Sequence, residues 1–303
     1  MENPIVIENL KKSYGKVQAV DNVSLEVAPG EVFGLIGPDG AGKTTIIRIL
    51  VSLLSPDSGK VFFLGKDVSK NPVFVRSHIG YMPQRFSLYR DLSVEQNLRF
   101  FGDLFHISRA KQGKQMEWLY NFSKLRPFKN RLAGALSGGM KQKLALSCML
   151  MHEPEVIVLD EPTFGVDPVS RHEFWDILKT LAEHGITILV STAYMDEANL
   201  CSRVALLHEG HILAMDKPKT LVQQFQHPIF RLESNQPYSL YTKLKTTEFA
   251  DSIHLFGDGI HFSDKDQLGQ RTIVRKLKEW NIEYDSIQPV QANLEDLFLE
   301  RMR

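Results

Sequence analysis

The sequence predicts an α/β protein, and three features of the chain support this prediction. Between residues 156 and 208, short apolar runs alternate with helical patterns, which is the rhythm of a parallel sheet with helices on both faces. A glycine-rich turn follows an earlier apolar run, at residues 32–36, and opens a helix. Near residues 223–228 the pattern changes. Because 303 residues are enough for about two domains, we predict one over residues 1–222 and another over residues 223–303.

The charge balance and the cysteine count exclude some classes of protein. The chain has 36 Lys and Arg residues and 36 Asp and Glu residues, so its net charge is zero. This argues against a strongly basic nucleic-acid binder and a polybasic membrane anchor, although it leaves room for local patches. The N-terminus lacks a secretory pattern, and no apolar window predicts a membrane span. Cys148 and Cys201 cannot build a disulfide framework, which favours a reducing compartment.

The N-terminal elements predict an antiparallel β subdomain. Residues 5–7 and 17–27 alternate in the way of half-buried strands, with residues 14–16 as the turn between them. Residues 32–36 form a nearly continuous apolar run, which is typical of a strand buried on both faces. We predict a helix over residues 44–54, which a turn containing Pro and Gly ends.

A helical subdomain is predicted at about residues 86–150. Ser93 is a candidate N-cap, because Gln96 follows three residues later as in a capping box. Ser137 opens another helix, which extends to about residue 151. The strands that follow are predicted at residues 156–159, 186–191 and 204–208, and the helices between them at residues 172–184 and 195–200.

The C-terminal part predicts a small α+β domain. Residues 229–290 have the pattern strand, helix, strand, strand, helix and strand, which is the βαββαβ order. Pro237 begins the first helix, and Asp258-Gly259 predicts a hairpin turn. Asp266 is the expected cap of the second helix.

A phosphate-binding loop follows the strand at residues 32–36. Its glycines allow backbone N–H groups to turn inward around phosphate oxygens, and the helix N-terminus adds partial positive charge. Lys43 would bridge the β- and γ-phosphates of a nucleotide, Thr44 would place its hydroxyl on Mg²⁺, and Thr45 would reach the α-phosphate. The loop matches the pattern G-x-x-x-x-G-K-[ST] with Gly37, Pro38, Asp39, Gly40, Ala41, Gly42, Lys43 and Thr44. The alternative is an accidental turn with a solvated lysine.

Two acidic residues follow the apolar run at residues 156–159. In a parallel sheet, ligands bind beyond the carboxyl ends of the strands, so Asp160 would hold the Mg²⁺ through water. Because neighbouring residues of a strand point in opposite directions, Glu161 must lie past the strand end to face the γ-phosphate. There it would orient or deprotonate the attacking water. The alternative is a pair of solvated loop acids.

A short motif between these two elements reads Leu-Ser-Gly-Gly-Met at residues 136–140. In this order the motifs resemble those of the ATP-binding cassette (ABC) family, whose signature is usually written LSGGQ. The signature positions are Ser137, Gly138 and Gly139. The resemblance covers roughly residues 4–222 and implies a P-loop NTPase fold of the ABC ATPase type, with ATP and Mg²⁺ as its ligands. Alone, the motif reads as a Ser-capped helix start.

The resemblance also implies roles for three further residues. Tyr14 is similar to the family's adenine-stacking aromatic residue, and Asp167 to a residue of the loop that crosses the dimer interface. Gln84 is similar to the glutamine that touches Mg²⁺ and the water and that senses the membrane subunit. The alternatives are a surface tyrosine, an N-cap before Pro168 and a polar loop residue.

A head-to-tail dimer is the assembly that the resemblance implies. Two ATP molecules would lie between the phosphate loop of one subunit and the signature of the other. Ser137 and the adjacent N–H groups lie at a helix N-terminus, which favours anions. Hydrolysis would remove the γ-phosphate charge and loosen the contact. The partner is either a second copy of this chain or a different ABC ATPase subunit.

One position departs from the family pattern. The family's switch histidine follows the next strand, typically as S-T-H-Y-M-[DE]-E-A, and this chain has Ala193 in its place. Losing one polar contact to developing charge can cost about 3 kcal/mol, or about 100-fold in rate. His184 lies before the strand, so it is not expected to substitute. We therefore predict that the Lys43 site binds ATP and hydrolyses it slowly. The alternative is that Glu161 suffices.

The resemblance favours an exporter. The stretch Tyr-Met-Asp-Glu-Ala at residues 194–198 and the ending at residues 293–299 are similar to those of drug and polysaccharide export subunits. Such subunits work with separate polytopic membrane permease subunits, at the cytoplasmic face of the inner or plasma membrane. The C-terminal domain would stabilise the dimer or regulate it. Two other readings remain: a soluble ABC ATPase that acts on ribosomes or DNA, and an ATP-binding regulator that does not hydrolyse ATP.

A helix of the permease is expected to dock near Gln84 and residues 86–105. The aromatic residues of this region are Phe86, Phe100, Phe101 and Phe105, and the alternative for them is core packing. The zero net charge gives no support to a nucleic-acid partner.

Overall fold

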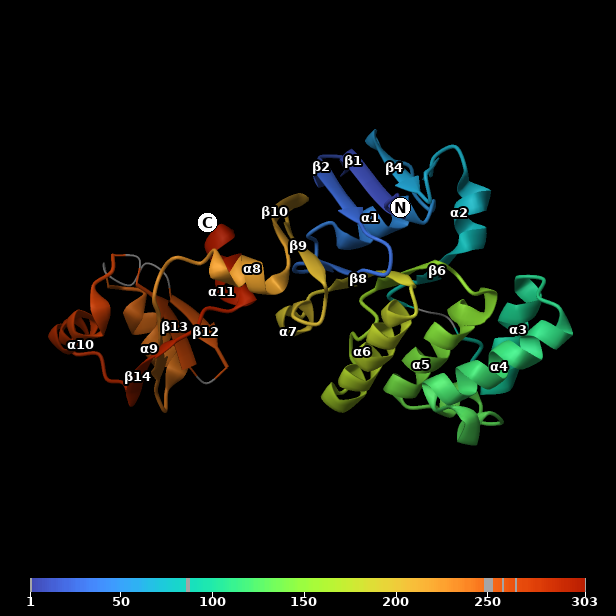
Figure 1. The fold of residues 1–303 in the computed structure, drawn as a ribbon. Helices are drawn as coiled ribbons and strands as arrows, with labels where there is room; N and C mark the ends of the chain where they lie inside the picture. Colours follow the sequence, from blue (N-terminus) through green and yellow to red (C-terminus); the bar gives the residue numbers. More distant parts are fainter. Residues whose placement is uncertain (1, 86–87, 248–252, 258, 265, 303) are drawn as a thin grey trace. The chain divides into compact units, whose positions relative to one another are not determined.

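The computed structural model describes residues 2–85, 88–247, 253–257, 259–264 and 266–302 (Figure 1). The chain divides into two compact units, one up to Lys217 and one from Pro218 onward. The boundary between the units lies five residues before the predicted one, because the helix α8 (Pro218–Gln223) packs on α11 (Leu294–Arg301) of the second unit. None of the helices in the described ranges combines the length and the apolar character that crossing a bilayer requires.

A six-stranded sheet forms the centre of the first unit. Its order is β10-β9-β3-β8-β7-β6, and every pair is parallel except β9 with β10. The strands are β3 (Val32–Ile36), β6 (Ile79–Met82), β7 (Val156–Asp160), β8 (Thr187–Thr192), β9 (Arg203–His208) and β10 (His211–Asp216). Every residue of β3, β7 and β8 is buried, which confirms the predicted α/β fold with a parallel sheet. The edge strand β10 was not predicted, because its half-buried pattern depends on pairing with β9.

A second sheet forms the predicted antiparallel β subdomain. Its order is β2-β1-β4-β5, and it consists of β1 (Ile5–Tyr14), β2 (Val17–Val27), β4 (Ser58–Phe63) and β5 (Lys66–Asp67). The strand predicted at residues 5–7 therefore extends to the turn, and β4 and β5 are additions to the prediction. The helix α1 (Lys43–Leu50) ends four residues early, because Ser52 is in the left-handed region with a φ of 58°. Apolar residues of both sheets and of α1 share one core.

The described part of the helical subdomain contains three α-helices, which are drawn in teal and green in Figure 1: α3 (Val94–Leu104), α4 (Arg109–Ser123) and α5 (Gly138–Met149). The predicted capping box is confirmed. The Ser93 hydroxyl accepts from the Gln96 N–H at 3.2 Å, and the Gln96 side chain accepts from the Ser93 N–H at 2.8 Å. Phe86 lies outside the described residues.

Two further helices differ from the predicted ranges. The helix α6 (Pro168–Glu183) begins four residues early, because the Asp167 carboxylate accepts from the Ser170 N–H at 2.9 Å and Pro168 occupies the first turn. This confirms that Asp167 is an N-cap, and the hydrogen bonds from Ser170 lower the pKa of its carboxyl group. The helix α7 (Met195–Ala198) is two residues shorter than predicted.

The second unit has the predicted βαββαβ order. It contains β11 (Ile229–Glu233), α9 (Pro237–Leu244), β12 (Ile253–Phe256), β13 (Gly259–Ser263), α10 (Gly269–Glu279) and β14 (Ser286–Val290). The antiparallel sheet has the order β12-β13-β11-β14, and its core includes buried residues of α9 and α10. The pairing of Phe256 with Gly259 confirms the predicted hairpin, although Asp258 itself lies outside the described residues.

The predicted cap of α10 is wrong. Asp266 is exposed, whereas the buried Asp264 carboxylate accepts from the Leu268 N–H and from the Gly269 N–H, both at 2.8 Å. Sequence spacing favoured the nearer aspartate. The backbone turns at Gln267, which has a φ of 52°, and this turn directs the two N–H groups to Asp264.

Asp264→Ala is expected to lower the free energy of unfolding of the second unit by about 2 kcal/mol, because two backbone N–H groups would lose a buried charged acceptor. Asp266→Ala is the matched control and should change it by less than about 0.5 kcal/mol. Urea titrations of the full chain, followed by circular dichroism, measure both changes. Equal effects of the two substitutions would show that Asp264 is not the cap.

Candidate functional site

The phosphate loop connects β3 to α1 and requires glycine at two close approaches. A Cβ atom on Gly37 would lie 2.3 Å from the Leu207 carbonyl oxygen, and one on Gly42 would lie 2.3 Å from that of Ala19. Gly42 also has a φ of 103°, which side chains rarely adopt. The first N–H groups of α1 have no partner within the helix, so they are available to an anion.

Lys43 is the buried cation at the centre of the site. Its side chain is only 4% exposed, and its Nζ donates to the carbonyl oxygens of Gly37 at 2.7 Å and Pro38 at 3.0 Å. Its Nζ also lies 3.1 Å from Oε1 of Glu161, whose side chain is 8% exposed. The phosphate loop and the end of β7 are therefore joined by an ion pair that solvent barely reaches.

The carboxylates of Asp160 and Glu161 have separate partners. Asp160 ends β7, and its Oδ1 accepts from the Thr44 hydroxyl at 3.1 Å and from the Ser191 hydroxyl at 2.7 Å. Glu161 lies past the strand end, as predicted, with a φ of 49°. The Ser191 hydroxyl accepts from the Glu161 N–H at 3.0 Å. Burial, and then the negative charge of Asp160, raise the pKa of Tyr81 to about 12, so this phenol stays protonated.

Gln84 completes the group. It follows β6, and its Nε2 donates to Oε2 of Glu161 at 2.8 Å. The side chains of Lys43, Gln84 and Glu161 border a cavity of about 440 Å³. Its lining consists of Ala19, Asp39, Gly40, Ala41, Gly42, Lys43, Thr44, Thr45, Gln84, Glu161 and Phe164. The loops after β3, β7 and β6 thus bring together most of the residues that the sequence singled out.

The other predicted residues lie outside the lining of this cavity. Tyr14 is 48% exposed at the end of β1, and Asp167 caps α6. Ser137 is exposed and caps α5, with its hydroxyl 3.3 Å from the Met140 N–H. Gly138 is exposed beside it, and Gly139 packs so closely on Ser170 that a Cβ would lie 2.5 Å away. Each is placed on the surface of the first unit or at a helix start.

Ala193 is exposed and directly follows β8. His184 lies at the opposite end of that strand, where its Nδ1 is 2.7 Å from the Thr180 carbonyl oxygen. The six residues of β8 separate the two positions by about 20 Å. His184 therefore cannot take the place of a histidine at position 193.

Ser191 is a residue of the site that the sequence analysis missed. It bonds both acidic residues because β7 and β8 are parallel neighbours and Asp160 pairs with Ser191. A polar residue at the end of an apolar strand was the available signal, since that is also how Asp160 was found.

The donor set suits a triphosphate with Mg²⁺. Oxygen ligands are those that Mg²⁺ prefers, and the Thr44 hydroxyl, the Asp160 carboxylate and the Gln84 amide supply them. Within the described ranges, no group of three or more His, Cys, Asp and Glu side chains is arranged to hold a metal ion. Mg²⁺ does not need such a group, because it keeps several waters and binds through one or two carboxylates plus phosphates. Fold and site together define a P-loop ATPase.

Comparisons with known proteins specify the class further. The family model described as ABC transporter matches residues 20–164. The chain is 35% identical over 304 residues to Nod factor export ATP-binding protein I of Burkholderia lata. This alignment covers 98% of this chain and 96% of that protein. It is 45% identical over 232 residues to the probable multidrug ABC transporter ATP-binding protein YbhF of Escherichia coli. This alignment covers 76% of this chain and 40% of that protein.

A solved structure with a similar fold supports the same class. It is the dimeric structure of a post-hydrolysis state of an ATP-binding cassette bound to ADP and Pi, with a TM-score of 0.64 and 26% identity, and the match covers 70% of this chain and 98% of that one. The chain therefore belongs to the family of ABC transporter ATP-binding proteins, which are ABC-type ATPases.

Proposed function

We propose that this chain is the ATP-binding subunit of an ABC exporter, which binds MgATP and couples its hydrolysis to transport by separate polytopic membrane subunits. The observation that carries the proposal is the buried Lys43, which joins the phosphate loop to Glu161 at 3.1 Å. The name of the Burkholderia lata relative, Nod factor export ATP-binding protein I, supports the direction of transport. The chain would act at the cytoplasmic face of the membrane.

The roles of the residues follow from their positions. The N–H groups from Gly40 to Thr44 would bind phosphate oxygens, and Lys43 would turn from Glu161 to the β- and γ-phosphates. Thr44, Asp160 and Gln84 would hold the Mg²⁺, which when bound neutralises phosphate charge. Thr45 would contact the α-phosphate, and Tyr14 would stack on the adenine.

ATP binding would also activate Glu161. Its Oε1 contacts Lys43 at 3.1 Å and its Oε2 accepts from Gln84 at 2.8 Å, so both carboxylate oxygens are engaged. When Lys43 moves to the phosphates, Oε1 becomes available to accept a proton from the attacking water, which Gln84 would help to orient. The ion pair thus restricts the base until nucleotide is bound.

The residues outside the cavity fit a second subunit. Ser137 and the N–H groups at the start of α5 would contact the γ-phosphate bound by a partner, and Asp167 would lie at the interface. The partner would be a second copy or another ABC ATPase subunit. The related cassette that is dimeric with ADP and Pi supports this arrangement.

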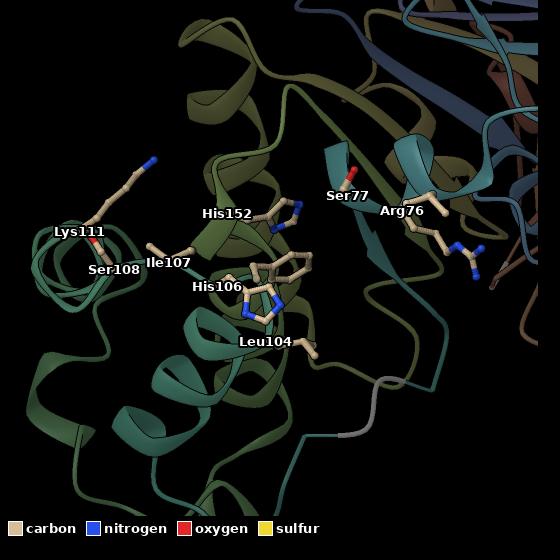
Figure 2. A pocket seen from close by; sticks show the side chains of 10 residues that line it. Arg76, Ser77, Leu104, His106, Ile107, Ser108, Lys111 and His152 are labelled. Atoms are coloured by element: carbon tan, nitrogen blue, oxygen red, sulfur yellow. The ribbon is translucent and has the colours of Figure 1, made fainter.

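A hollow of about 780 Å³ is the proposed docking place for a helix of a membrane subunit (Figure 2). It lies between α2 (Pro72–His78) and the segment that joins α3 to α4, next to residue 105, the end of the predicted docking region. Val73 is 74% exposed and Leu104 is 56% exposed in its lining, which makes an apolar contact surface. Since α2 leads directly into β6 and Gln84, movement of the helix would reach the ATP site.

His152 forms part of the wall of this hollow (Figure 2). Its ring stacks on Phe105 with centroids 3.9 Å apart. Burial lowers the pKa of His152, so the ring is neutral at pH 7. A neutral aromatic pair suits contact with an apolar side chain of the docked helix.

Leu104→Asp is expected to reduce co-purification with the co-expressed membrane subunits by at least about tenfold, because a carboxylate buried against an apolar helix loses its hydration. Leu53→Asp is the matched control, since Leu53 is 57% exposed and lies outside the hollow. Purification in detergent measures the ratio of the subunits. ATP affinity of both variants should equal that of the unmodified chain. Retention of the complex by Leu104→Asp would reject this docking place.

A further inference from the structure

The proposed mechanism assigns no function to Glu197, a buried carboxylate next to two loops of the ATP site. Glu197, in α7, is 2% exposed. Its Oε1 accepts from the Thr163 hydroxyl at 2.7 Å, and its Oε2 accepts from the Thr192 hydroxyl at 2.6 Å. Both threonines are 1% exposed. Arg171 is the nearest cation, with its Nε 3.9 Å from Oε1.

The two threonines belong to different loops of the site. Thr163 follows Glu161 by two residues, in a turn closed by the hydrogen bond from the Phe164 N–H to the Glu161 carbonyl oxygen at 3.2 Å. Thr192 ends β8 and precedes Ala193. Glu197 therefore connects the loop that carries the proposed base to the loop that lacks the switch histidine.

Thr192 extends the network to the phosphate loop. Its hydroxyl accepts from the Tyr194 N–H at 3.0 Å, and its carbonyl oxygen accepts from the Gly37 N–H at 3.3 Å. The start of the phosphate loop, the turn after β7 and the turn after β8 are thus linked through one carboxylate.

We propose that Glu197 is a positioning residue of the ATPase site, which fixes the loop of Glu161 against the loop of Ala193 through Thr163 and Thr192. The inference rests on the proposed ATPase function. Burying a carboxylate is costly unless its lone pairs are satisfied, and an apolar side chain would fill the same space at lower cost. What the carboxylate adds is direction, because two short bonds from opposite loops define the distance between them.

The arrangement has a consequence for position 193. Ala193 contributes no polar side chain, so the loop after β8 can act on the site only through its backbone position. A histidine introduced there would reach the γ-phosphate only if the loop is held in place. The effect of Ala193→His should therefore depend on Thr192 and Glu197.

The test uses Thr163→Val and Thr192→Val, which keep the shape of the side chain and remove one bond to Glu197 each. Single-turnover hydrolysis, with the full chain in excess over MgATP, is expected to slow about tenfold in each variant, while the Kd for ATP changes less than twofold. Thr192→Ser and Thr163→Ser restore the hydroxyl and should return at least half of the rate. The same variants made in the Ala193→His chain should lose most of the gain from that histidine.

Thr187→Val is the matched control. Thr187 lies at the other end of β8, is 3% exposed, and its hydroxyl accepts from the Gly30 N–H at 3.0 Å. It should lower the melting temperature as much as Thr192→Val does and leave the rate of hydrolysis unchanged. A purely structural role of Glu197 predicts instead that rate follows melting temperature in all three valine variants.

The outcomes separate this inference from the function on which it rests. Rates of Thr163→Val and Thr192→Val within twofold of the unmodified chain, with Lys43→Ala still abolishing ATP binding, would reject the positioning role and leave the ATPase proposal intact. Failure of the unmodified chain and of Ala193→His to hydrolyse ATP in a single turnover would reject both.

Discussion

Lys43→Ala is expected to raise the Kd for ATP by at least about 100-fold. Lys43 is buried, and its ammonium group is placed between the phosphate loop and Glu161. Two charge-assisted contacts to phosphates are together worth about 3 kcal/mol or more, and every 1.4 kcal/mol is a factor of ten in affinity. Isothermal titration calorimetry of the purified chain with MgATP measures the change.

The matched control for this prediction is Lys70→Ala, because the Lys70 side chain is 81% exposed and lies on the β subdomain. It should leave the Kd unchanged. Lys43→Ala also leaves the buried Glu161 without its cation, so circular dichroism must first show that the variant is folded. Lys43→Met, which keeps most of the side-chain volume, should give the same loss of affinity. An affinity within threefold of the unmodified chain in both folded variants would contradict the assignment.

Ala193→His is expected to increase the turnover of ATP by the purified chain by about 100-fold, because it restores a polar contact to charge that develops in the transition state. Glu161→Gln is expected to remove hydrolysis from the unmodified chain and from Ala193→His, while the Kd for ATP stays within about threefold. Release of phosphate measures the rates.

Ala110→His is the control for the added imidazole, since Ala110 is exposed in α4 and lies outside the cavity at Lys43. It should not change the turnover. Brisk hydrolysis by the unmodified chain that is lost in Glu161→Gln would refute the slow site and show that Glu161 suffices. No hydrolysis in Ala193→His, with normal ATP binding, would favour the ATP-binding regulator over the transport ATPase.

The chemistry of the phosphate loop and of the end of β7 could be predicted because each depends on a short stretch of sequence. An apolar strand followed by glycines and Lys43 defines its own geometry, and so does an apolar strand followed by Asp160 and Glu161. The structure confirms that these stretches meet, since Lys43 and Glu161 form an ion pair. The placing of Ser137 opposite a neighbour's nucleotide stays a prediction.

Other features depended on partners that the sequence does not reveal. The strands β4, β5 and β10 have few fully buried residues, so the pairing of β4 with β1, of β5 with β4 and of β10 with β9 decides their structure. Glu197 bonds Thr163 across 34 residues, and no local pattern indicates which loops meet. Asp264 was passed over for Asp266 because the turn between them, and not the spacing, selects the cap.

The most direct test of the proposed ATP site at Lys43 is a crystal structure of the unmodified chain with Mg²⁺ and a non-hydrolysable ATP analogue. We predict that the Nζ of Lys43 leaves Glu161 and contacts the β- and γ-phosphates, that the N–H groups of Gly40 to Thr44 bind phosphate oxygens, and that Thr44 and Asp160 hold the metal. Nucleotide bound elsewhere, with the Lys43–Glu161 pair still at about 3.1 Å, would contradict it.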